Sequence, residues 1–364
     1  MPQLLHLDHV EDIIFDGNYI QAFDILAALA DRLMGDKTIK GLRVTEKFDG
    51  APAVVFGRNP DNGRYFVGTK SVFNKRIPKI AYNNEDIVEH YGCKPELALK
   101  LKMLRETLTD HYPDGVYQAD IMWTPDSINI DKGGIHFNPN TITYHQTIDH
   151  PDAPSISSKG LGLCVHTKYI GQTLPEMDAV PIDKMDIAMF NMFNVDAFYI
   201  DPYMNMNKIV ILDQDWKDHM NGMMTHLDGM DQRNTARMAL SRIHANAKNL
   251  RIFINYCIRI GEYAPCVEMY EQFLDNRDEH TLLANVAANH EAFETVFNIH
   301  RMMTEIKLML LHAMHGANQF ITTVGKDVIH GEGYVVNYYG STYKLVNRLE
   351  FSRLNFMNKR FEKA

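Results

Sequence analysis

The stretch that decides the fold is Thr45-Glu46-Lys47-Phe48-Asp49-Gly50, with Ala53-Val54-Val55-Phe56-Gly57 just after it. A lysine beside a tight Asp-Gly leads into an apolar run that ends at glycine, a pattern typical of a buried strand. Asn59-Pro60-Asp61-Asn62-Gly63 is then a strong turn signal, and Tyr65-Phe66-Val67-Gly68 begins a returning strand. The sequence therefore predicts a β-hairpin directly after Lys47.

Helical and strand-like segments surround this hairpin. Apolar spacing predicts helices over 10–35 and 84–110. Residues 215–320 carry helical spacing almost throughout, and 333–346 has the pattern of a strand hairpin around Gly340. Further strands are predicted over 115–122, 141–144, 161–166, 195–199 and 209–212.

This order predicts an α+β fold of antiparallel sheets with flanking helices. We expect one domain to begin with residues 1–214 and to finish with 323–364, which supplies its last strands and a C-terminal tail. A mainly α-helical domain over 215–322 is then an insertion. Only a short segment follows the last predicted strand, so no C-terminal OB-fold is expected.

Composition excludes several classes of protein. The chain is 45% hydrophobic and 23% charged, a balance typical of globular proteins rather than disordered ones. Its net charge of −9 means that any contact with nucleic acid needs a local basic patch. The cysteines form no CxxC pair, which argues against a zinc site or a disulfide framework and favours a cytoplasmic setting. No apolar run is long enough for a membrane span, and the N-terminus lacks the features of a signal peptide.

Lys47 is the first candidate for catalysis. A lysine amine is a nucleophile only when it is neutral, so a catalytic lysine must be desolvated or placed near other cations. Its position between an apolar strand and a tight turn would fix the amine inside a cleft. On the tetrapeptide alone, a surface lysine before a turn is the alternative.

The order of motifs resembles the covalent nucleotidyltransferase superfamily, which includes ATP-dependent DNA ligases, RNA ligases and mRNA capping enzymes. Lys47-Phe48-Asp49-Gly50 resembles the motif whose lysine becomes linked to AMP or GMP. The later motifs are matched in order by Gly68-Thr69-Lys70-Ser71, Tyr117-Gln118-Ala119-Asp120-Ile121, Leu163-Cys164-Val165-His166-Thr167-Lys168-Tyr169, His330-Gly331-Glu332-Gly333-Tyr334-Val335-Val336 and Tyr343-Lys344-Leu345-Val346.

The resemblance implies a role for each motif around bound ATP. Lys47 is then the nucleophile, Lys344 contacts the α-phosphate, and Lys70 contacts the sugar or a phosphate. Thr45 and Glu46 lie at the nucleotide, where Glu46 resembles the RNA-ligase glutamate that reads the adenine amino group.

The same resemblance implies a metal and a stacking ring. Asp120 and Glu332 are the expected ligands of Mg²⁺ or Mn²⁺, since magnesium prefers a few carboxylates with waters and phosphates. His166 or Tyr169 would stack on the base, and Tyr169 is favoured because its ring is neutral. Either ring is otherwise a packed core residue. Asp49 would hold the metal or the nucleic-acid end in later steps.

The chain departs from the family pattern at several positions. Val346 stands where the last motif usually has a second lysine, with Arg348 two residues further on. Asp120 replaces the usual glutamate, and Lys70 replaces an arginine, which removes a bidentate contact.

A basic stretch within the helical block is the candidate for nucleic-acid contact. Residues 233–259 lack Asp, Glu, Gly and Pro, so one long helix is predicted. Its helical spacing groups Arg233, Arg237, Lys248 and Arg251 on one side, where they would follow a phosphate backbone. The alternative is a solvated face paired with the acidic segment 262–279. Arg348 opens a second basic cluster that continues through Arg353, Lys359, Arg360 and Lys363, or else belongs to a frayed tail.

These motifs predict an ATP-dependent polynucleotide ligase that joins 5′-phosphate and 3′-hydroxyl ends. Its partners would be ends or nicks in DNA or RNA. The enzyme would be a monomer and would not bind a membrane. The K-x-D-G form favours DNA, whereas Glu46 and the missing OB-fold favour RNA. A capping-type guanylyltransferase, a non-catalytic nucleic-acid-binding module and a phage structural or accessory protein are the alternatives. The chain also resembles ligase-like proteins of tailed phages, which would place it in the cytoplasm of a host cell.

Overall fold

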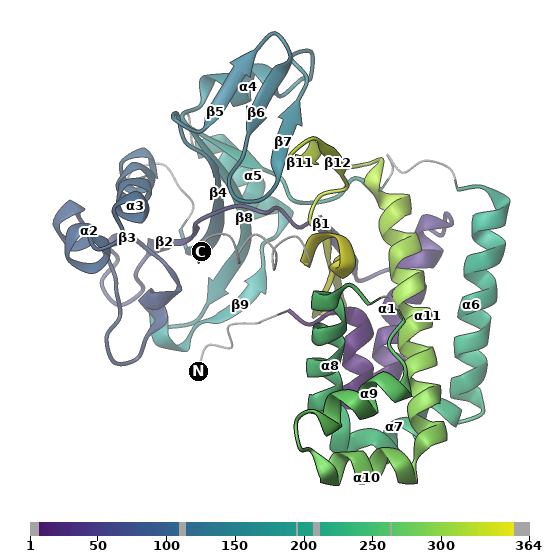
Figure 1. The fold of residues 1–364 in the computed structure, drawn as a ribbon. Coiled ribbons are helices and arrows are strands. Elements are labelled where there is room, and N and C mark those ends of the chain that lie inside the picture. The colour runs from purple at the N-terminus through teal and green to yellow at the C-terminus, as the bar shows by residue number, and fades with distance from the viewer. Residues whose placement is uncertain (1–6, 109–113, 194–195, 207–211, 263, 353–364) are drawn as a thin grey trace. The chain divides into compact units, whose positions relative to one another are not determined.

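The computed structural model describes residues 7–108, 114–193, 196–206, 212–262 and 264–352. These residues form a mixed α+β fold, as the sequence predicts (Figure 1). They divide into two compact units, between which the chain passes several times. We call one the sheet unit, made of Lys47–Tyr203 and Gln319–Gly331. The other is the helical unit, made of Leu7–Glu46, Met204–Asn318 and the segment from Glu332 onward.

The main sheet of the sheet unit has the strand order β10-β8-β4-β2-β3, with β9 paired to β8. Neighbours are antiparallel except for β10 and β8, which run parallel. The strands are β2 (Ala53–Arg58), β3 (Tyr65–Gly68), β4 (Val116–Trp123), β8 (Leu161–Ile170), β9 (Asp178–Pro181) and β10 (Ala197–Ile200).

Both faces of this sheet are covered, which explains why β2 is a continuous apolar run rather than an alternating one. Val54 and Phe56 face a core that includes side chains of the helices, whereas Val55 faces a smaller cluster with Phe66 and Phe73. The covering elements are η2 (Lys70–Phe73), α2 (Asn84–Tyr91), α3 (Pro95–Leu108), η3 (Leu174–Glu176) and α5 (Lys184–Phe193). Burying each such side chain stabilises the fold by roughly 1.5–3 kcal/mol.

A second sheet in the same unit has the order β12-β11-β7-β6-β5. Its inner face buries Ile135, Phe137 and Tyr144, while its outer face carries His136 and His145. The short helix α4 (Ala153–Ser158) follows β7 in the chain. The strands are β5 (Ile128–Asp131), β6 (Gly134–Phe137), β7 (Thr143–Gln146), β11 (Ile321–Val324) and β12 (Asp327–Ile329).

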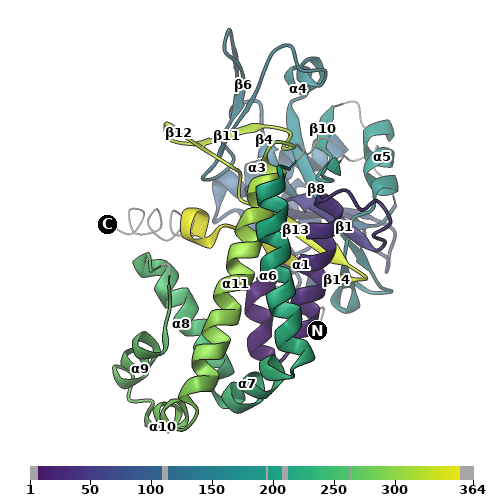
Figure 2. The same ribbon diagram turned by 90° about the vertical axis from the view of Figure 1, so that its right-hand side faces the viewer.

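The helical unit is organised around the long helix α11 (His290–His315), which lies beside α1 and α6 (Figures 1 and 2). Among the residues that the structure describes, no helix is long and apolar enough to cross a membrane. The other helical elements are η1 (Val10–Asp16), α1 (Tyr19–Leu33), α6 (Gln214–Gln232), α7 (Thr235–Ile243), η5 (His244–Asn246), α8 (Ala247–Ile260), α9 (Val267–Asp275), α10 (His280–Ala288) and η6 (Arg348–Ser352).

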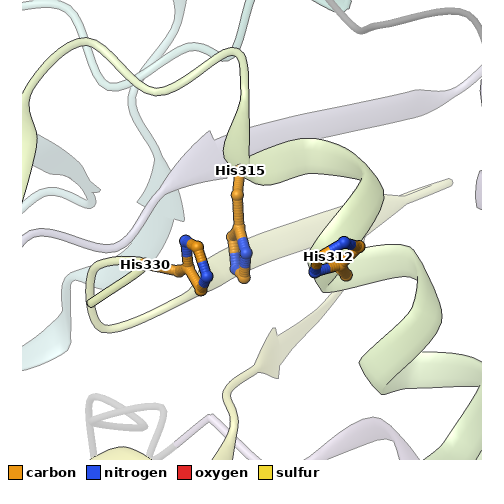
Figure 3. A group of neighbouring side chains, drawn as sticks. All are labelled: His312, His315 and His330. Atoms are coloured by element: carbon orange, nitrogen blue, oxygen red, sulfur yellow. The ribbon is translucent and has the colours of Figure 1, made fainter. Parts of the chain in front are cut away.

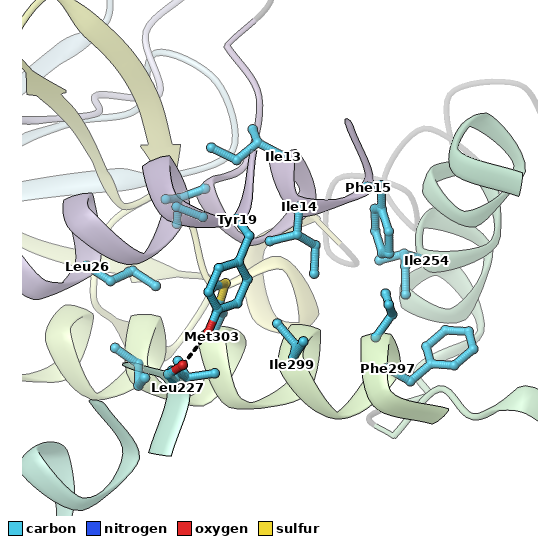
Figure 4. Close-up of a cluster of buried hydrophobic side chains, with 14 of the residues drawn as sticks. Ile13, Ile14, Phe15, Tyr19, Leu26, Leu227, Ile254, Phe297, Ile299 and Met303 are labelled. Atoms are coloured by element: carbon cyan, nitrogen blue, oxygen red, sulfur yellow. Dashed lines mark hydrogen bonds between the residues drawn. The ribbon is translucent and has the colours of Figure 1, made fainter. Parts of the chain in front are cut away.

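The core of this unit joins segments from opposite ends of the chain. Figure 4 shows Tyr19 of α1 against Leu227 of α6 and Met303 of α11. The Tyr19 hydroxyl donates a 2.7 Å hydrogen bond to the Leu227 carbonyl, so the buried phenol is satisfied. This bond, together with the surrounding apolar contacts, fixes α1 against a helix that follows it by about two hundred residues.

A small sheet of order β1-β13-β14 also belongs to the helical unit. It is formed by β1 (Leu42–Glu46), β13 (Tyr334–Tyr338) and β14 (Ser341–Leu345). Val44, Val336 and Leu345 share their core with the helices. The last strands of the described chain thus join β1, near its start, in a sheet separate from the two of the sheet unit.

The compact units differ from the expected domains at both ends of the described chain. Residues 7–46, which were expected in the first domain, pack with the helices. Residues 323–331 lie in the sheet unit through β11 and β12, but the segment from Glu332 onward, expected in the same domain, belongs to the helical unit. The pattern of a helix or strand shows that one face of a segment is buried but not which partner buries it, so it could not assign these segments.

Several predicted helices are interrupted. The helix expected over 10–35 divides at Gly17 into η1 and α1, and that over 84–110 divides into α2 and α3. The predicted long helix over 233–259 is wrong, since α7 and α8 are separated by η5. The strand expected over 209–212 lies almost wholly outside the described residues.

Candidate functional site

Residues 48–51, which follow Lys47, are each held by contacts with other parts of the sheet unit. Phe48 is buried, and its ring packs against Tyr144 and Phe320 with centroids 5.7 and 6.1 Å apart. The backbone N–H of Ala51 donates to the carbonyl of Ile121 on β4 at 3.1 Å. Lys47 itself is half-buried at the start of this loop. The backbone that carries the lysine is therefore anchored in the core of the sheet unit.

Asp49 anchors the loop to the turn before β7. Its carboxylate accepts hydrogen bonds from the Asn140 side chain at 2.8 Å and from the backbone N–H groups of Thr141 and Ile142 at 2.8 and 3.2 Å. Its own backbone N–H donates to the Tyr144 hydroxyl at 2.7 Å. The expected role of Asp49 at a metal or a nucleic-acid end is thus corrected, because this buried carboxylate is already engaged in holding the loop.

Gly50 lies directly against Asp120 of β4. A Cβ built on Gly50 would lie 2.5 Å from the Cβ of Asp120 and 2.8 Å from the sulfur of Met122, closer than real Cβ atoms approach. The absence of a side chain therefore permits this contact. Through it, the K-x-D-G loop is packed against the strand that carries the predicted acidic residue.

Asp120 and His166 form a pair across neighbouring strands. Asp120 Oδ1 lies 3.7 Å from His166 Nε2, and the two side chains are 18% and 33% exposed. The other ring nitrogen of His166, Nδ1, lies 2.8 Å from the Thr167 hydroxyl. The pair is thus partly accessible, and the sheet unit brings Gly50, Asp120 and His166 close together.

Tyr169 does not share this accessible position. It is buried, its ring centroid lies 4.3 Å from that of Phe73, and its hydroxyl donates to Gln118 Oε1 at 2.7 Å. Burial raises its pKa to about 12. The preference for Tyr169 as the stacking ring is therefore corrected, because a ring inside the core has no free face for a base. Of the two candidates, His166 has the accessible ring.

Lys70 lies in η2 and its side chain is exposed. The element begins at Thr69, whose hydroxyl accepts the Ser71 N–H at 3.4 Å and lies 2.9 Å from the Ser71 hydroxyl. Tyr91 secures this turn by accepting the Thr69 N–H at 3.2 Å. The structure therefore fixes the backbone at Lys70 and leaves its amine on the surface.

In the helical unit, the small sheet aligns the remaining motifs. Thr45 is in register with Val335, and Val335 is in register with Lys344. These residues share the face of the sheet opposite to Val44 and Val336, which enter the core. The backbone N–H of Lys344 donates to the carbonyl of Asp8 at 3.0 Å. Lys344 is thus held on both sides of β14.

Glu46 and Glu332 lie at the end of the same sheet. Glu46 is in register with Tyr334, and Glu332 precedes that residue by two positions. Burial and then the charge of Glu46 raise the pKa of the Tyr334 phenol, which donates a short hydrogen bond to Asn318. The end of β1 next to Lys47 is therefore acidic.

The basic residues of the helical block do not form one stripe. Because η5 separates α7 from α8, the arc calculated for one continuous helix does not apply. Arg237 pairs with Asp231 at 3.2 Å, and Arg251 pairs with Asp8 and Asp16. Arg233 and Lys248 are exposed at other points of the unit. The predicted nucleic-acid face over 233–259 is thus wrong as a helical surface.

Arg348 is likewise not a surface contact. It is buried, donates to both carboxylate oxygens of Asp12 at 3.0 and 2.9 Å, and also donates to Asn255 at 2.8 Å. His300 lies 2.9 Å from Asp12, and the fully buried Lys307 donates to Glu11. We call Glu11, Asp12, His300, Lys307 and Arg348 the buried charge cluster. The other members of the expected C-terminal basic cluster, from Arg353 on, lie outside the described residues.

Sequence reasoning missed the residues that hold the lysine loop. Asn140 and Tyr144 lie more than ninety residues from Asp49 and belong to no recognised motif. A turn of the form Asn138-Pro139-Asn140 indicates only a change of direction, not the partner it binds. Figure 3 shows a further feature that was missed: His312 and His315 lie one turn apart on α11, with ring centroids 6.1 Å apart. The third histidine labelled there, His330, belongs to the sheet unit.

Comparison with known proteins places the chain in a family. A family model described as a family of unknown function (DUF6267) matches residues 5–360, so the chain belongs to that family. No curated protein and no solved structure matches the chain. The geometry of the residues is therefore the basis for a functional proposal.

Proposed function

We propose that the chain is an ATP-dependent polynucleotide ligase in which Lys47 carries AMP. The observation that supports this most is the anchoring of the loop after Lys47 at Phe48, Asp49 and Gly50. A covalent catalyst must present its nucleophile in one geometry, and effective positioning accounts for a large part of such rate enhancements. A solvent-facing lysine before an ordinary turn needs no such anchoring.

The proposed reaction has three steps. The neutral amine of Lys47 attacks the α-phosphorus of ATP, a P–N bond forms, pyrophosphate leaves, and an amine proton passes to solvent. An oxygen of a 5′-phosphate end then attacks the same phosphorus, the P–N bond breaks, and the lysine amine regains a proton. Finally a 3′-hydroxyl attacks the activated 5′-phosphate, a phosphodiester bond forms, and AMP leaves as the hydroxyl proton passes to solvent.

Asp120 and His166 are the residues of the sheet unit that we assign to the nucleotide. Their 3.7 Å separation and partial exposure leave carboxylate and imidazole lone pairs for ribose hydroxyls or an ion. The carboxylate oxygens of Asp120 are of the kind that Mg²⁺ or Mn²⁺ prefers, as are those of Glu332 in the helical unit. A divalent ion held by such a carboxylate would neutralise charge on the pyrophosphate leaving group.

Lys344 fits the contact with the α-phosphate. Its position on β14 is fixed by register with Val335 and by the bond from its N–H to Asp8. A cationic side chain on a fixed strand stabilises charge that develops on phosphate oxygens in the transition state.

The nucleotide and the acceptor remain matters for experiment. Glu46 lies next to Lys47 and would accept from the adenine amino group, which favours ATP over GTP. DNA and RNA ends share the 5′-phosphate and 3′-hydroxyl that the chemistry requires, so either is compatible with the proposal. The host cytoplasm, where ATP is present, is the proposed location.

The test is formation of a covalent nucleotide adduct. The full chain is incubated with Mg²⁺ and ATP or GTP labelled at the α-phosphate, and the labelled protein is resolved under denaturing conditions. We expect ATP to label the wild-type chain and Lys47→Ala to remain unlabelled. Lys132→Ala, which replaces an exposed lysine outside the site, is the matched control and should be labelled normally.

The acceptor is then identified with nicked duplexes of every DNA and RNA combination and with single strands. Sealing of any of these by wild type but not by Lys47→Ala supports the ligase. Labelling by GTP alone would instead indicate a guanylyltransferase. Binding of nucleic acid without any labelled adduct would show a non-catalytic module and would exclude the proposed enzyme.

A further inference from the structure

His136 and His145 face each other on the outer side of the second sheet. They are direct partners in the register of β6 and β7. Their neighbours along each strand, Ile135, Phe137 and Tyr144, point into the core, so both imidazoles lie on the opposite, half-exposed face. The sheet thus places two imidazole rings at adjacent positions that solvent can reach.

The two rings approach through the same kind of nitrogen. Nδ1 of His136 lies 2.7 Å from Nδ1 of His145, and the ring planes are inclined at 72°. At this distance a single proton can lie between the nitrogens, because a second one would remove the only acceptor.

The outer nitrogens are held by separate partners. Nε2 of His136 lies 3.4 Å from the Asp131 carboxylate, which can only accept, so this nitrogen carries a proton. Nε2 of His145 lies 2.8 Å from the Thr323 hydroxyl, which can donate or accept. In the neutral pair, His145 therefore donates from Nδ1 to His136 and accepts at Nε2 from Thr323.

We propose that His136 and His145 form a binding site for one borderline divalent cation, of the class of Zn²⁺, Ni²⁺ or Cu²⁺. The ion would bind both Nδ1 atoms, and these nitrogens would separate from 2.7 Å to about 3.3 Å because each metal–nitrogen bond is about 2.0–2.1 Å long. His145 then carries its proton on Nε2 and donates it to Thr323, whose hydroxyl rotates to accept, so no proton needs to leave the neutral pair. Imidazole nitrogens suit these ions, whereas Mg²⁺ prefers oxygen.

The surroundings match those of known histidine metal sites. A metal-bound histidine commonly donates its other N–H to a carboxylate or another oxygen, which fixes the ring and strengthens the ligand. Asp131 and Thr323 occupy these positions here. With two protein ligands, the remaining coordination positions are open to water or to a small ligand. This site is separate from the carboxylates proposed for Mg²⁺ and does not depend on ligase activity.

The test uses the full chain, freed of metal, titrated with ZnCl₂, NiCl₂ or MgCl₂. Binding is followed by calorimetry and by the ring ¹⁵N signals of the histidines, which are assigned from single substitutions. We expect Zn²⁺ to shift the His136 and His145 signals together and Mg²⁺ to leave them in place. His136→Gln and His145→Gln should each weaken this binding event at least tenfold.

Two further variants distinguish a specific site at His136 and His145 from nonspecific binding of metal ions to surface histidines. Thr323→Val removes the partner of His145 Nε2 and should weaken binding several-fold while both ligands remain. His150→Gln removes a histidine of the same unit whose Nδ1 accepts from the Asp152 backbone, and it should leave the titration unchanged. The proposal is overturned if His145→Gln binds as wild type does, or if Zn²⁺ shifts only other histidines.

Discussion

Gly50 and Asp120 pack so closely that a Cβ on the glycine would lie 2.5 Å from the Cβ of the aspartate. The two residues belong to different predicted motifs, one at the lysine loop and one on β4. Their contact means that the shape of the loop and the position of the carboxylate are set together.

Gly50→Ala is expected to displace the loop from β4. The added methyl group meets atoms of Asp120 and Met122, so the backbone must move, and we expect loss of stability together with at least tenfold slower adduct formation. Gly222→Ala is the control, because this exposed helical glycine has open space around it. There, alanine should raise stability by about 0.5–1 kcal/mol in thermal unfolding. If Gly50→Ala forms the adduct at the wild-type rate, the shape of the lysine loop does not depend on its contact with Asp120.

Asp49→Asn should weaken the anchor of the lysine loop. The asparagine amide keeps one acceptor oxygen for the N–H groups of Thr141 and Ile142, but it lacks the carboxylate charge and turns an NH₂ group toward the Asn140 side-chain donor. We expect a loss of roughly 1–3 kcal/mol in urea unfolding. Asp114→Asn alters a mostly exposed carboxylate that pairs with Arg58, and it should change stability by about 0.5 kcal/mol or less. Equal effects of the two substitutions would show that Asp49 is not an anchor.

Tyr169→Phe distinguishes a core residue from a nucleotide contact. It removes the hydroxyl that donates to the buried Gln118, so we expect a loss of about 1 kcal/mol in the free energy of unfolding. The KM for ATP in adduct formation should stay unchanged. His166→Ala, in contrast, should raise that KM, since its ring is accessible. A higher KM for ATP in Tyr169→Phe, with normal stability, would show that Tyr169 contacts the nucleotide.

Arg348→Leu should be among the most destabilising single substitutions in the helical unit. It leaves the buried Asp12 carboxylate without the guanidinium nitrogen that donates to both of its oxygens, and breaking a buried pair typically costs about 3–5 kcal/mol. Arg237→Leu removes an exposed pair with Asp231 and should cost roughly 1 kcal/mol or less. Urea unfolding of both variants tests the difference. If Arg348→Leu keeps full stability but loses affinity for nucleic acid, the arginine acts at the surface after all.

Acid should destabilise the chain through the same cluster. Burial alone would raise the pKa of Asp12, but the Arg348 charge and the His300 hydrogen bond outweigh it and hold that pKa below its ordinary value. The unfolded state therefore takes up the proton first. Stability from Asp12 is complete above the ordinary carboxyl pKa of about 3.9 and declines as pH falls toward the folded value. Unfolding free energies of wild type and Asp12→Asn should converge over that range, and a constant difference would contradict the assignment.

Local patterns predicted the elements around Lys47 well. The run Val54-Val55-Phe56 and the turn at 59–63 identify β2 and β3, because a covered strand is apolar on both faces and its turn has few alternatives. The hairpin around Gly340 was likewise found from its alternation and its glycine. In each case the decisive contacts lie within a few residues of one another.

The helix boundaries could not be predicted in this way, because they depend on contacts with residues far away in the sequence. The predicted long helix is interrupted at His244–Asn246, where the buried Asn246 amide donates to the Tyr270 hydroxyl and accepts from Asn285. Neither partner is visible from residues 233–259. Arg348 was misplaced for the same reason, since basic residues near a chain end suggest a surface, whereas Asp12 lies at the other end of the sequence.

The candidate site contains features that local patterns predict and features that depend on distant residues. Lys47 and Asp120 were selected from their motifs; the strand predicted for Asp120 is β4, and the hairpin predicted after Lys47 is formed by β2 and β3. The engagement of Asp49 by Asn140 and the enclosure of Tyr169 are tertiary outcomes, which a motif cannot specify. A motif identifies a residue type at a position, and packing then determines whether that residue faces a ligand or the core.

The pairing of β1 with β13 also constrains how the chain is made. Leu42 is in register with Tyr338, so the two paired strands are almost three hundred residues apart in the sequence. During synthesis, β1 therefore emerges from the ribosome long before β13 has been made. Until then its ladder groups are an exposed strand edge, a template for aggregation. Synthesis of a chain shortened before β13 should therefore yield an aggregating fragment rather than a smaller folded protein.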